Sequence, residues 1–422
     1  MIAALRSVWA LLLGMGILML GHGLQGTLLP VRASLEGFGT AVIGMVMSGY
    51  FLGLLAGALL TPRLVARVGH VRVFAALASL ASSVILIQAL FVLPSLWFAL
   101  RFLSGVCLCG IYIVAESWLN GTVRNDRRGQ LFSVYMVVQL GGIAAGQFLL
   151  TLADPRGETL FILASILLSL ALLPLLLSAR PTPPIEPHRA FGLPQLYRVS
   201  PLGVVGIGGI GLAQSALYAM GPVYAGAVGL GTAGISTFMA LAILGGVIFQ
   251  YPIGRASDRF DRRTVLTAVT VLAALVVLGA LAADPPPPAL FVMFFLFGGF
   301  SLPLYSVCVA HTNDFLGRDE LVGASSALLL VNAIGSALGP TLAAVAMQGL
   351  GNRGFPLFLA AMHLAIGGFA LWRMTRRAAP PLAAQGPTVF ISTSAAASPV
   401  ATSVAQAERL QREPEAPAAA AR

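Results

Sequence analysis

Long apolar segments separated by short polar loops make up most of this chain. Each segment is close to the roughly 20 residues that an α-helix needs to cross the ~30 Å hydrocarbon core of a membrane. The pattern therefore predicts an all-α membrane protein with twelve transmembrane helices. The segments lie at residues 8–30, 40–61, 73–93, 96–119, 130–152, 159–178, 202–224, 232–252, 265–283, 289–311, 322–348 and 355–374.

Glycines recur at helical spacing within several of these segments. Gly49, Gly53 and Gly57 share one face of the second segment, and Gly335 and Gly339 share one face of the eleventh. Small residues four positions apart let helix backbones approach closely in lipid. We therefore expect close helix crossings at these positions.

Two cationic loops occupy the same place in each half of the chain. Residues 62–72 follow the second segment, and residues 254–263 follow the eighth. Such duplication is typical of transporters whose two repeats move against each other, and it predicts two pseudo-symmetric six-helix halves. The stretch after the twelfth segment is rich in Ala, Pro and Ser, and a segment of this composition cannot bury a hydrophobic core. The expected divisions are an N-terminal half at 1–178, a cytoplasmic linker loop at 179–201, a C-terminal half at 202–377 and a disordered cytoplasmic tail at 378–422.

The composition excludes a water-soluble protein. Of 422 residues, 58% are hydrophobic and only 9% are charged, whereas soluble domains carry about 25% charged residues. All 25 basic residues are arginine, and they lie between the apolar segments rather than on one face. Lipid is therefore the expected surrounding, and nucleic acid is not an expected partner.

The distribution of arginine predicts the orientation. If the N-terminus is inside, the outer loops hold only Arg32, Arg156 and Arg353, and the inner loops hold several times more. By the positive-inside rule, both termini are cytoplasmic in a multi-pass protein of the plasma (bacterial inner) membrane.

No residue pattern indicates catalysis, a metal or a cofactor. Cys107, Cys109 and Cys308 fall inside apolar segments, and the first two point about 200° apart on a helix, so we interpret all three as core residues. The sequence has no Walker loop and no H-E-x-x-H motif. The chain is not expected to be an enzyme, and without an ATP-binding loop transport must use a gradient or run downhill.

The second cationic loop resembles a motif of the major facilitator superfamily. Residues 254–263 read G-R-A-S-D-R-F-D-R-R and match G-x-x-x-D-R-x-G-R-R, with Asp261 where the second Gly is usual. The first loop keeps Gly69 but has Ala66 in place of the Asp and Pro62 in place of the first Gly. The resemblance covers about residues 8–375 and implies the superfamily fold of twelve helices in two halves.

Other stretches add to this resemblance. Residues 101–105, R-F-L-S-G, resemble the R-x-x-Q-G pattern of proton-driven exporters, with Ser104 in place of Gln. The glycine-rich stretch at 141–146 is mirrored at 335–340. Residues 21–27 and 115–120 resemble the bacterial YcaD-like branch of the superfamily.

The resemblance implies a cytoplasmic gate near the two loops. Asp258 would face a neighbouring helix end and pair with an Arg, in a contact that breaks during each cycle. The alternative is a solvated loop charge that only sets topology. The candidate gate residues are Arg67, Gly69, Glu116, Asp258, Arg259, Arg262, Asp314 and Arg318.

Arg101 is the strongest candidate inside a segment. It shares a helical face with Gly105, Tyr112 and Glu116, which could line a central cavity. The alternative is that its side chain snorkels to the outer interface. Glu116 is about 22 Å from Arg101 along the helix, so the two cannot pair directly. We favour Glu116 as a paired charge at the inner gate over a titrating proton carrier.

Weaker candidates for the cavity lie on segments one, seven, ten and eleven. For each of them, the alternative is an ordinary hydrogen bond between helices. These candidates are His22, Gln25, Gln214, Tyr218 and Tyr305, with His311 and Asn332 as further polar positions.

These patterns together predict a secondary active transporter that moves a small solute by alternating access. Coupling to protons is plausible because residues 101–105 resemble the pattern of proton-driven exporters, but Ser104 in place of Gln weakens this argument. An uncharged, amphipathic or anionic solute suits the predicted cavity better than a polycation. We expect a monomer in the lipid bilayer with no nucleic-acid partner. The alternative class is a non-transporting receptor or regulator on the same scaffold, because a fold alone does not fix function.

Overall fold

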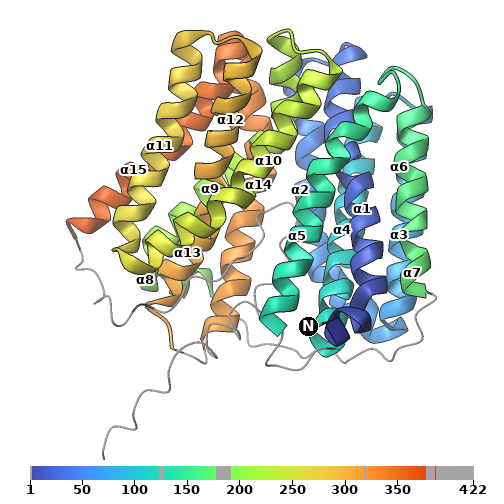
Figure 1. The fold of residues 1–422 in the computed structure, drawn as a ribbon, viewed down its shortest axis with the longest axis horizontal. Helices are drawn as coiled ribbons and strands as arrows, with labels where there is room; N and C mark the ends of the chain where they lie inside the picture. Colours follow the sequence, from blue (N-terminus) through green and yellow to red (C-terminus); the bar gives the residue numbers. More distant parts are fainter. Residues whose placement is uncertain (1, 123–127, 177–191, 318–319, 377–384, 386–422) are drawn as a thin grey trace, which may run out of the picture.

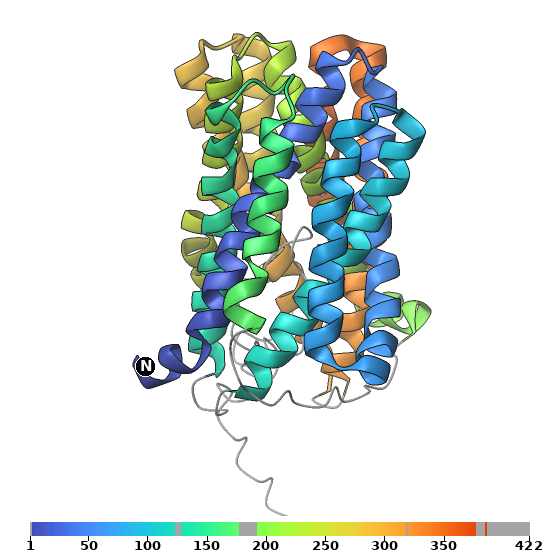
Figure 2. The same cartoon turned by 90° about the vertical axis from the view of Figure 1, so that its right-hand side faces the viewer.

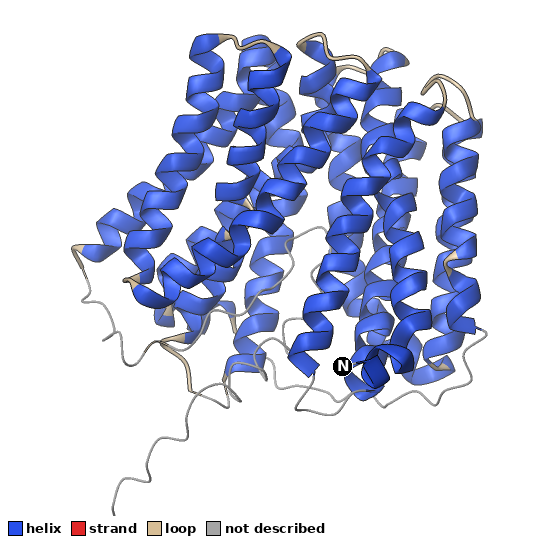
Figure 3. Ribbon diagram, in the orientation of Figure 1, coloured by secondary structure: helices blue, strands red, loops and turns tan. Residues whose placement is uncertain are grey.

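The computed structural model describes residues 2–122, 128–176, 192–317, 320–376 and 385, and within these residues every regular element is a helix (Figures 1 and 3). The N-terminal half contains long helices that run between two ends of the molecule. Its elements are α1 (Ile2–Leu35), α2 (Thr40–Val68), α3 (His70–Leu90), α4 (Pro94–Thr122), α5 (Arg128–Phe148), η2 (Leu149–Leu152), α6 (Thr159–Leu170) and α7 (Leu172–Leu176).

The C-terminal half repeats this arrangement after a short helix, α8, which lies in the region expected to be a linker loop. Its elements are α8 (Leu193–Val199), α9 (Pro201–Ala227), α10 (Thr232–Arg259), α11 (Arg262–Ala283), α12 (Pro287–Ser301), α13 (Leu304–Asn313), α14 (Leu321–Leu350), η3 (Gly351–Arg353) and α15 (Gly354–Met374).

Ten stretches of the described chain are long and apolar enough to cross a membrane, and they cover eleven of the twelve predicted segments. One of the ten, Gly323–Met374, contains both α14 and α15, and the sixth apolar segment appears as the shorter stretch Thr159–Pro174. The prediction of an all-α membrane protein is therefore confirmed. Figures 1 and 2 show these helices side by side along one common direction, with the N-terminus at the lower end. We call this lower end the inner end, following the expected orientation.

The tenth segment differs from its sequence prediction because its helix is interrupted. α12 ends at Ser301 and α13 begins at Leu304, with Pro303 between them. Proline has no N–H to donate within a helix, so the hydrogen-bond ladder is broken at this point. The sequence contained the signal, but the apolar pattern continues across it.

Equivalent helices pack in equivalent pairs in the two halves. α2 packs on α4 as α10 packs on α12, and α1 packs on α5 as α9 packs on α14. At the first crossing, a Cβ on Gly53 would overlap the Phe102 carbonyl. At the matching crossing, a Cβ on Gly245 would overlap the Phe295 carbonyl. The predicted close crossings and pseudo-symmetric halves are thus confirmed.

The two halves contact each other mainly through α2 against α14 and α5 against α10. Near the outer ends of α2 and α14, the hydroxyls of Ser48 and Thr341 are 2.8 Å apart. A Cβ on Gly44 there would overlap the Pro340 carbonyl and the Ala344 side chain. Toward the inner end, α10, α11 and α15 lean away from the N-terminal half (Figure 1).

Candidate functional site

Arg101 lies in the outer third of α4 and is almost fully enclosed, with 3% of its surface exposed. Its guanidinium carbon is 4.5 Å from the centre of the Tyr50 ring on α2. Among the described residues it has no hydrogen bond and no ion pair, and its Nε and Nη1 atoms are fully buried. A charge inside a membrane protein is costly unless something compensates it, so this cation is the most unusual group in the N-terminal half.

His22 and Tyr112 lie around Tyr50, the residue whose ring contacts Arg101. The His22 ring on α1 lies 5.5 Å from the Tyr50 ring, and its buried Nδ1 has no partner among the described residues. Tyr112 hydrogen bonds with Tyr50, and its hydroxyl also donates to the sulfur of Met19 at 3.7 Å. We call Arg101, Tyr50, His22 and Tyr112 the Arg101 cluster. It joins α1, α2 and α4.

The close crossing of α2 and α4 brings the cluster together. Gly105 lies one turn from Arg101, and a Cβ there would overlap the Tyr50 carbonyl. Because the backbones touch at this point, the Tyr50 ring lies directly against the guanidinium. Tyr50 was missed in the sequence because segment two was not counted among the cavity-lining segments.

Glu116 is fully buried near the inner end of α4 and belongs to a separate hydrogen-bond chain. The Tyr135 hydroxyl on α5 donates to Oε1 of Glu116 at 3.3 Å, and Nε2 of Gln139 donates to the Tyr135 oxygen at 2.8 Å. The structure therefore binds this carboxylate to α5. Arg124 and Arg127, its nearest predicted partners in sequence, lie outside the described residues.

The candidates of the C-terminal half lie around the α12–α13 interruption. Nε2 of Gln214 donates to the carbonyls of Ser301 and Leu302, at 3.0 and 3.3 Å. His363, which the sequence did not single out, accepts from or donates to the Ser301 hydroxyl at 2.9 Å. The buried Tyr305 hydroxyl has no partner among the described residues. Gln214 thus binds two backbone carbonyls at the interruption.

The other polar candidates are dispersed. Gln25 is buried on α1 and Tyr218 is half-buried on α9. His311 packs edge-on against the Phe315 ring at 5.1 Å, and Asn332 lies 3.5 Å from the Ile207 carbonyl.

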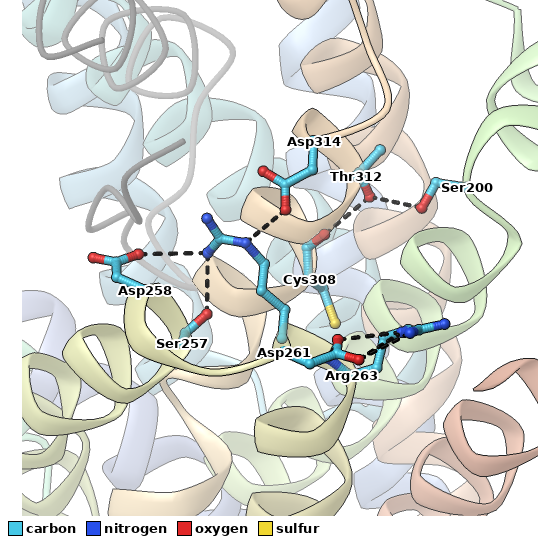
Figure 4. Close-up of polar contacts among 9 residues, drawn as sticks. Ser200, Ser257, Asp258, Asp261, Arg263, Cys308, Thr312 and Asp314 are labelled. Atoms are coloured by element: carbon cyan, nitrogen blue, oxygen red, sulfur yellow. Dashed lines mark hydrogen bonds and ion pairs between the residues drawn. The ribbon is translucent and has the colours of Figure 1, made fainter. Parts of the chain in front are cut away.

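Arg262 is the centre of a charged network at the inner end of the C-terminal half, and Figure 4 shows its partners Ser257, Asp258 and Asp314. Its Nε donates to Oδ2 of Asp314 at 2.7 Å, and its Nη1 donates to the Ser257 hydroxyl at 3.0 Å. Nη1 also lies 3.6 Å from Oδ1 of Asp258, a side chain that is 37% exposed. The motif residue Asp258 is therefore the more exposed and more distant carboxylate of the network. The short contact with Arg262 is made by the buried Asp314.

Asp261, which replaces the usual glycine of the motif, caps α11 and holds the next arginine. Its Oδ1 accepts from the Arg263 backbone N–H at 3.0 Å, and its Oδ2 accepts from Nη2 of Arg263 at 2.8 Å. Partial burial opposes ionisation, but the hydrogen bonds from Arg263 and the nearby charge of His311 hold the pKa of Asp261 below its usual value. Asp261, in place of the usual glycine, thus caps the N-terminus of α11.

The first loop has no such network among the described residues. Gly69 ends α2 with φ of +87°, a conformation that favours glycine, and Arg67 is exposed. Arg259 is likewise exposed, and Arg318 lies outside the described residues. Within the described chain, no group of three or more His, Cys, Asp or Glu residues could hold a metal ion.

A bundle of twelve membrane-spanning helices in two matching halves, with buried polar clusters between helices, is an architecture typical of secondary transporters. A family model described as Major Facilitator Superfamily matches residues 11–247 and 204–407. The chain therefore belongs to the major facilitator superfamily and is a multi-pass membrane transporter.

Relatives and solved structures agree with this assignment. The uncharacterized MFS-type transporter YcaD of Escherichia fergusonii is 32% identical over 347 residues, which cover 81% of this chain and 89% of the relative. An uncharacterized MFS-type transporter of Enterobacter sp. (strain 638) is 33% identical over 350 residues, with the same coverages. The resemblance to the YcaD-like branch is thus confirmed.

Two solved transporters share the fold at low sequence identity. The nucleoside transporter NupG has a TM-score of 0.70 at 13% identity, covering 88% of this chain and 98% of that chain. A D-xylose-proton symporter has a TM-score of 0.68 at 13% identity, covering 87% and 97%.

Proposed function

We propose that this transporter is a secondary active carrier that moves a small solute by alternating access. The Arg101 cluster is the observation that carries the proposal. It encloses a cation that has neither a hydrogen bond nor an ion pair among the described residues, at the junction of three helices. A carrier needs such groups to bind a solute in the middle of its path, and a purely structural site would satisfy them within the protein.

The contacts between the halves support an arrangement closed at the outer end. Ser48 and Thr341 join α2 to α14 there, and the C-terminal helices lean away at the inner end. In the cycle that we propose, these outer contacts break when the inner end closes. The Arg262–Asp314–Asp258 network would then act as part of the inner gate.

Crosslinking across the outer contact tests the proposal without knowledge of the solute. A Ser48→Cys/Thr341→Cys pair is oxidised in a background in which the three native cysteines are replaced, with Gln25→Cys as a reporter on α1. We expect the crosslink to protect the reporter from a membrane-impermeant thiol reagent added outside, and reduction to restore labelling.

A matched control lies within one half. The hydroxyls of Ser82 and Ser165 are 2.7 Å apart, on α3 and α6. A crosslink between cysteines at these positions should leave outside labelling of the reporter unchanged. Equal labelling with both crosslinks, or no outside labelling in any state, would contradict alternating access.

The orientation belongs to the same proposal, with both termini in the cytoplasm. Reporter fusions after Thr375 and at Gly192 should report the cytoplasmic side, and a fusion at Gly229 should report the outside. A reversed signal at any of the three would exclude this orientation. Flux driven by an imposed pH gradient then separates proton-coupled from downhill transport.

A further inference from the structure

We propose that the Arg101 cluster binds the carboxylate group of an anionic solute. This inference rests on the proposed transport function and names the class of its substrate. The starting observation is that Arg101 is 3% exposed and yet has neither a hydrogen bond nor an ion pair among the described residues.

The charge of the cluster favours an anion over a cation or a neutral solute. Arg101 remains positively charged because a guanidinium is not deprotonated in proteins. The acid on the same helix, Glu116, is about 22 Å away along the axis and is bound to Tyr135. A cationic solute would be repelled by Arg101, and a neutral solute would leave its charge uncompensated.

The Tyr50 ring orients the guanidinium for such a ligand. It lies under the guanidinium at 4.5 Å and attracts the cation through its face. With one face against the ring, the N–H donors at the edge of the guanidinium plane remain without partners. A planar fork of this kind matches the two oxygens of a carboxylate.

His22 adds a neighbouring group to the same site. Its ring lies 5.5 Å from that of Tyr50, and its Nδ1 is buried without a partner. An imidazole N–H there could bind an oxygen that Arg101 does not reach. Because the cluster contains one permanent positive charge, a monocarboxylate neutralises it, and a multiply charged anion would leave excess charge buried.

The first test needs no ligand and supplies the carboxylate from the protein itself. His22→Glu and His22→Gln are made in the full chain, each with Arg101 and with Arg101→Gln, and the Tm of the purified proteins is measured. Glu and Gln have the same shape, so their difference reports the charge. With Arg101 present, we expect the Tm of His22→Glu to exceed that of His22→Gln by at least about 3 °C. In the Arg101→Gln background, we expect the Tm of His22→Glu to fall below that of His22→Gln.

The same sign of the Glu–Gln difference in both backgrounds would overturn the proposal. The proposal would also be overturned if His22→Glu failed to fold in the presence of Arg101 while His22→Gln folded. A carboxylate would then not be accommodated near the guanidinium.

The second test uses probes that share a carbon skeleton and differ in the polar group and its charge. Benzoate, benzamide and benzylamine form one set, and butyrate, butyramide and butylamine form another. A carboxylate should raise the Tm of the wild-type protein when its amide and amine do not, and Arg101→Gln should weaken this binding at least about tenfold. The proposal would be overturned if neither carboxylate raised the Tm, or if an amide or amine raised the Tm as much as its carboxylate did.

These results are separable from failure of the transport proposal. The crosslinking experiment contains no ligand, so opening of the outer end can be established even if every carboxylate fails. Carboxylate binding without outer opening would instead support the site and contradict alternating access.

Discussion

Nε of Arg262 lies 2.7 Å from Oδ2 of Asp314, and both side chains are only 1% exposed. The pair joins the beginning of α11 to the residue that caps the end of α13. A charged pair buried this deeply depends on both partners, because removal of either takes away the nearest opposite charge of the other.

Asp314→Asn should therefore destabilise the protein much more than Asp258→Asn. The first change leaves the buried Arg262 without its short contact, and we expect a loss of about 3–5 kcal/mol in the free energy of unfolding. The second removes a 3.6 Å contact of a side chain that is 37% exposed, with an expected loss of about 0–1 kcal/mol. Denaturation of the purified variants measures both, and equal losses would contradict the ranking.

Gly105→Ala should disrupt the crossing of α2 and α4. An added Cβ would overlap the Tyr50 carbonyl and approach the Leu54 nitrogen to 2.8 Å, and both are backbone atoms that can move only with their helix. We expect a loss of about 1–3 kcal/mol or more. Gly141→Ala is the matched control, since nothing lies within 4 Å of its added Cβ, and its Tm should stay the same or rise.

Asp261 should contribute an acid-sensitive part of the stability. Although burial opposes ionisation, Arg263 holds the pKa of Asp261 below its ordinary value of 3.8. The contribution is therefore complete above about pH 4 and disappears as the pH falls through the lower folded-state pKa. The Tm advantage of the wild-type protein over Asp261→Asn should be steady from pH 6 to about pH 4 and shrink as the pH falls below about 4. A constant advantage would show that Asp261 acts only as a neutral cap.

Gln214→Leu should weaken the packing of α9 on the α12–α13 interruption. It removes two hydrogen bonds to the Ser301 and Leu302 carbonyls, each worth about 0.6 kcal/mol in a membrane protein. Gln250→Leu is the control, because Nε2 of Gln250 makes a single contact at 3.1 Å to the Ser306 hydroxyl. A smaller loss of unfolding free energy for Gln214→Leu than for the control would argue against a stabilising role of these two hydrogen bonds.

The helices and their crossings could be predicted from the sequence because lipid imposes a simple rule on both. Apolar length determines a span, and glycines such as Gly53 and Gly335 allow backbones to touch. The site was harder to predict. Arg101 could be identified because a charge in an apolar segment is rare, but Tyr50 looks like any other aromatic residue of a membrane helix.

The charged network shows the same limit. The motif directed attention to Asp258, whereas the shortest contact of Arg262 goes to Asp314, 52 positions further along the chain. Which carboxylate approaches an arginine depends on how α11 and α13 pack, and spacing within one loop does not contain that information.

The interruption at Pro303 makes the two halves mechanically unequal. α4 is one helix from Pro94 to Thr122, so a force applied at its inner end is carried to its outer end by an unbroken ladder of hydrogen bonds. Its counterpart in the other half, α12 and α13, lacks a rung at Pro303, where bending is easiest. Within this pair of equivalent helices, α4 is therefore the stiff member and α12–α13 the jointed one, so a bending force on both would deform the C-terminal member first.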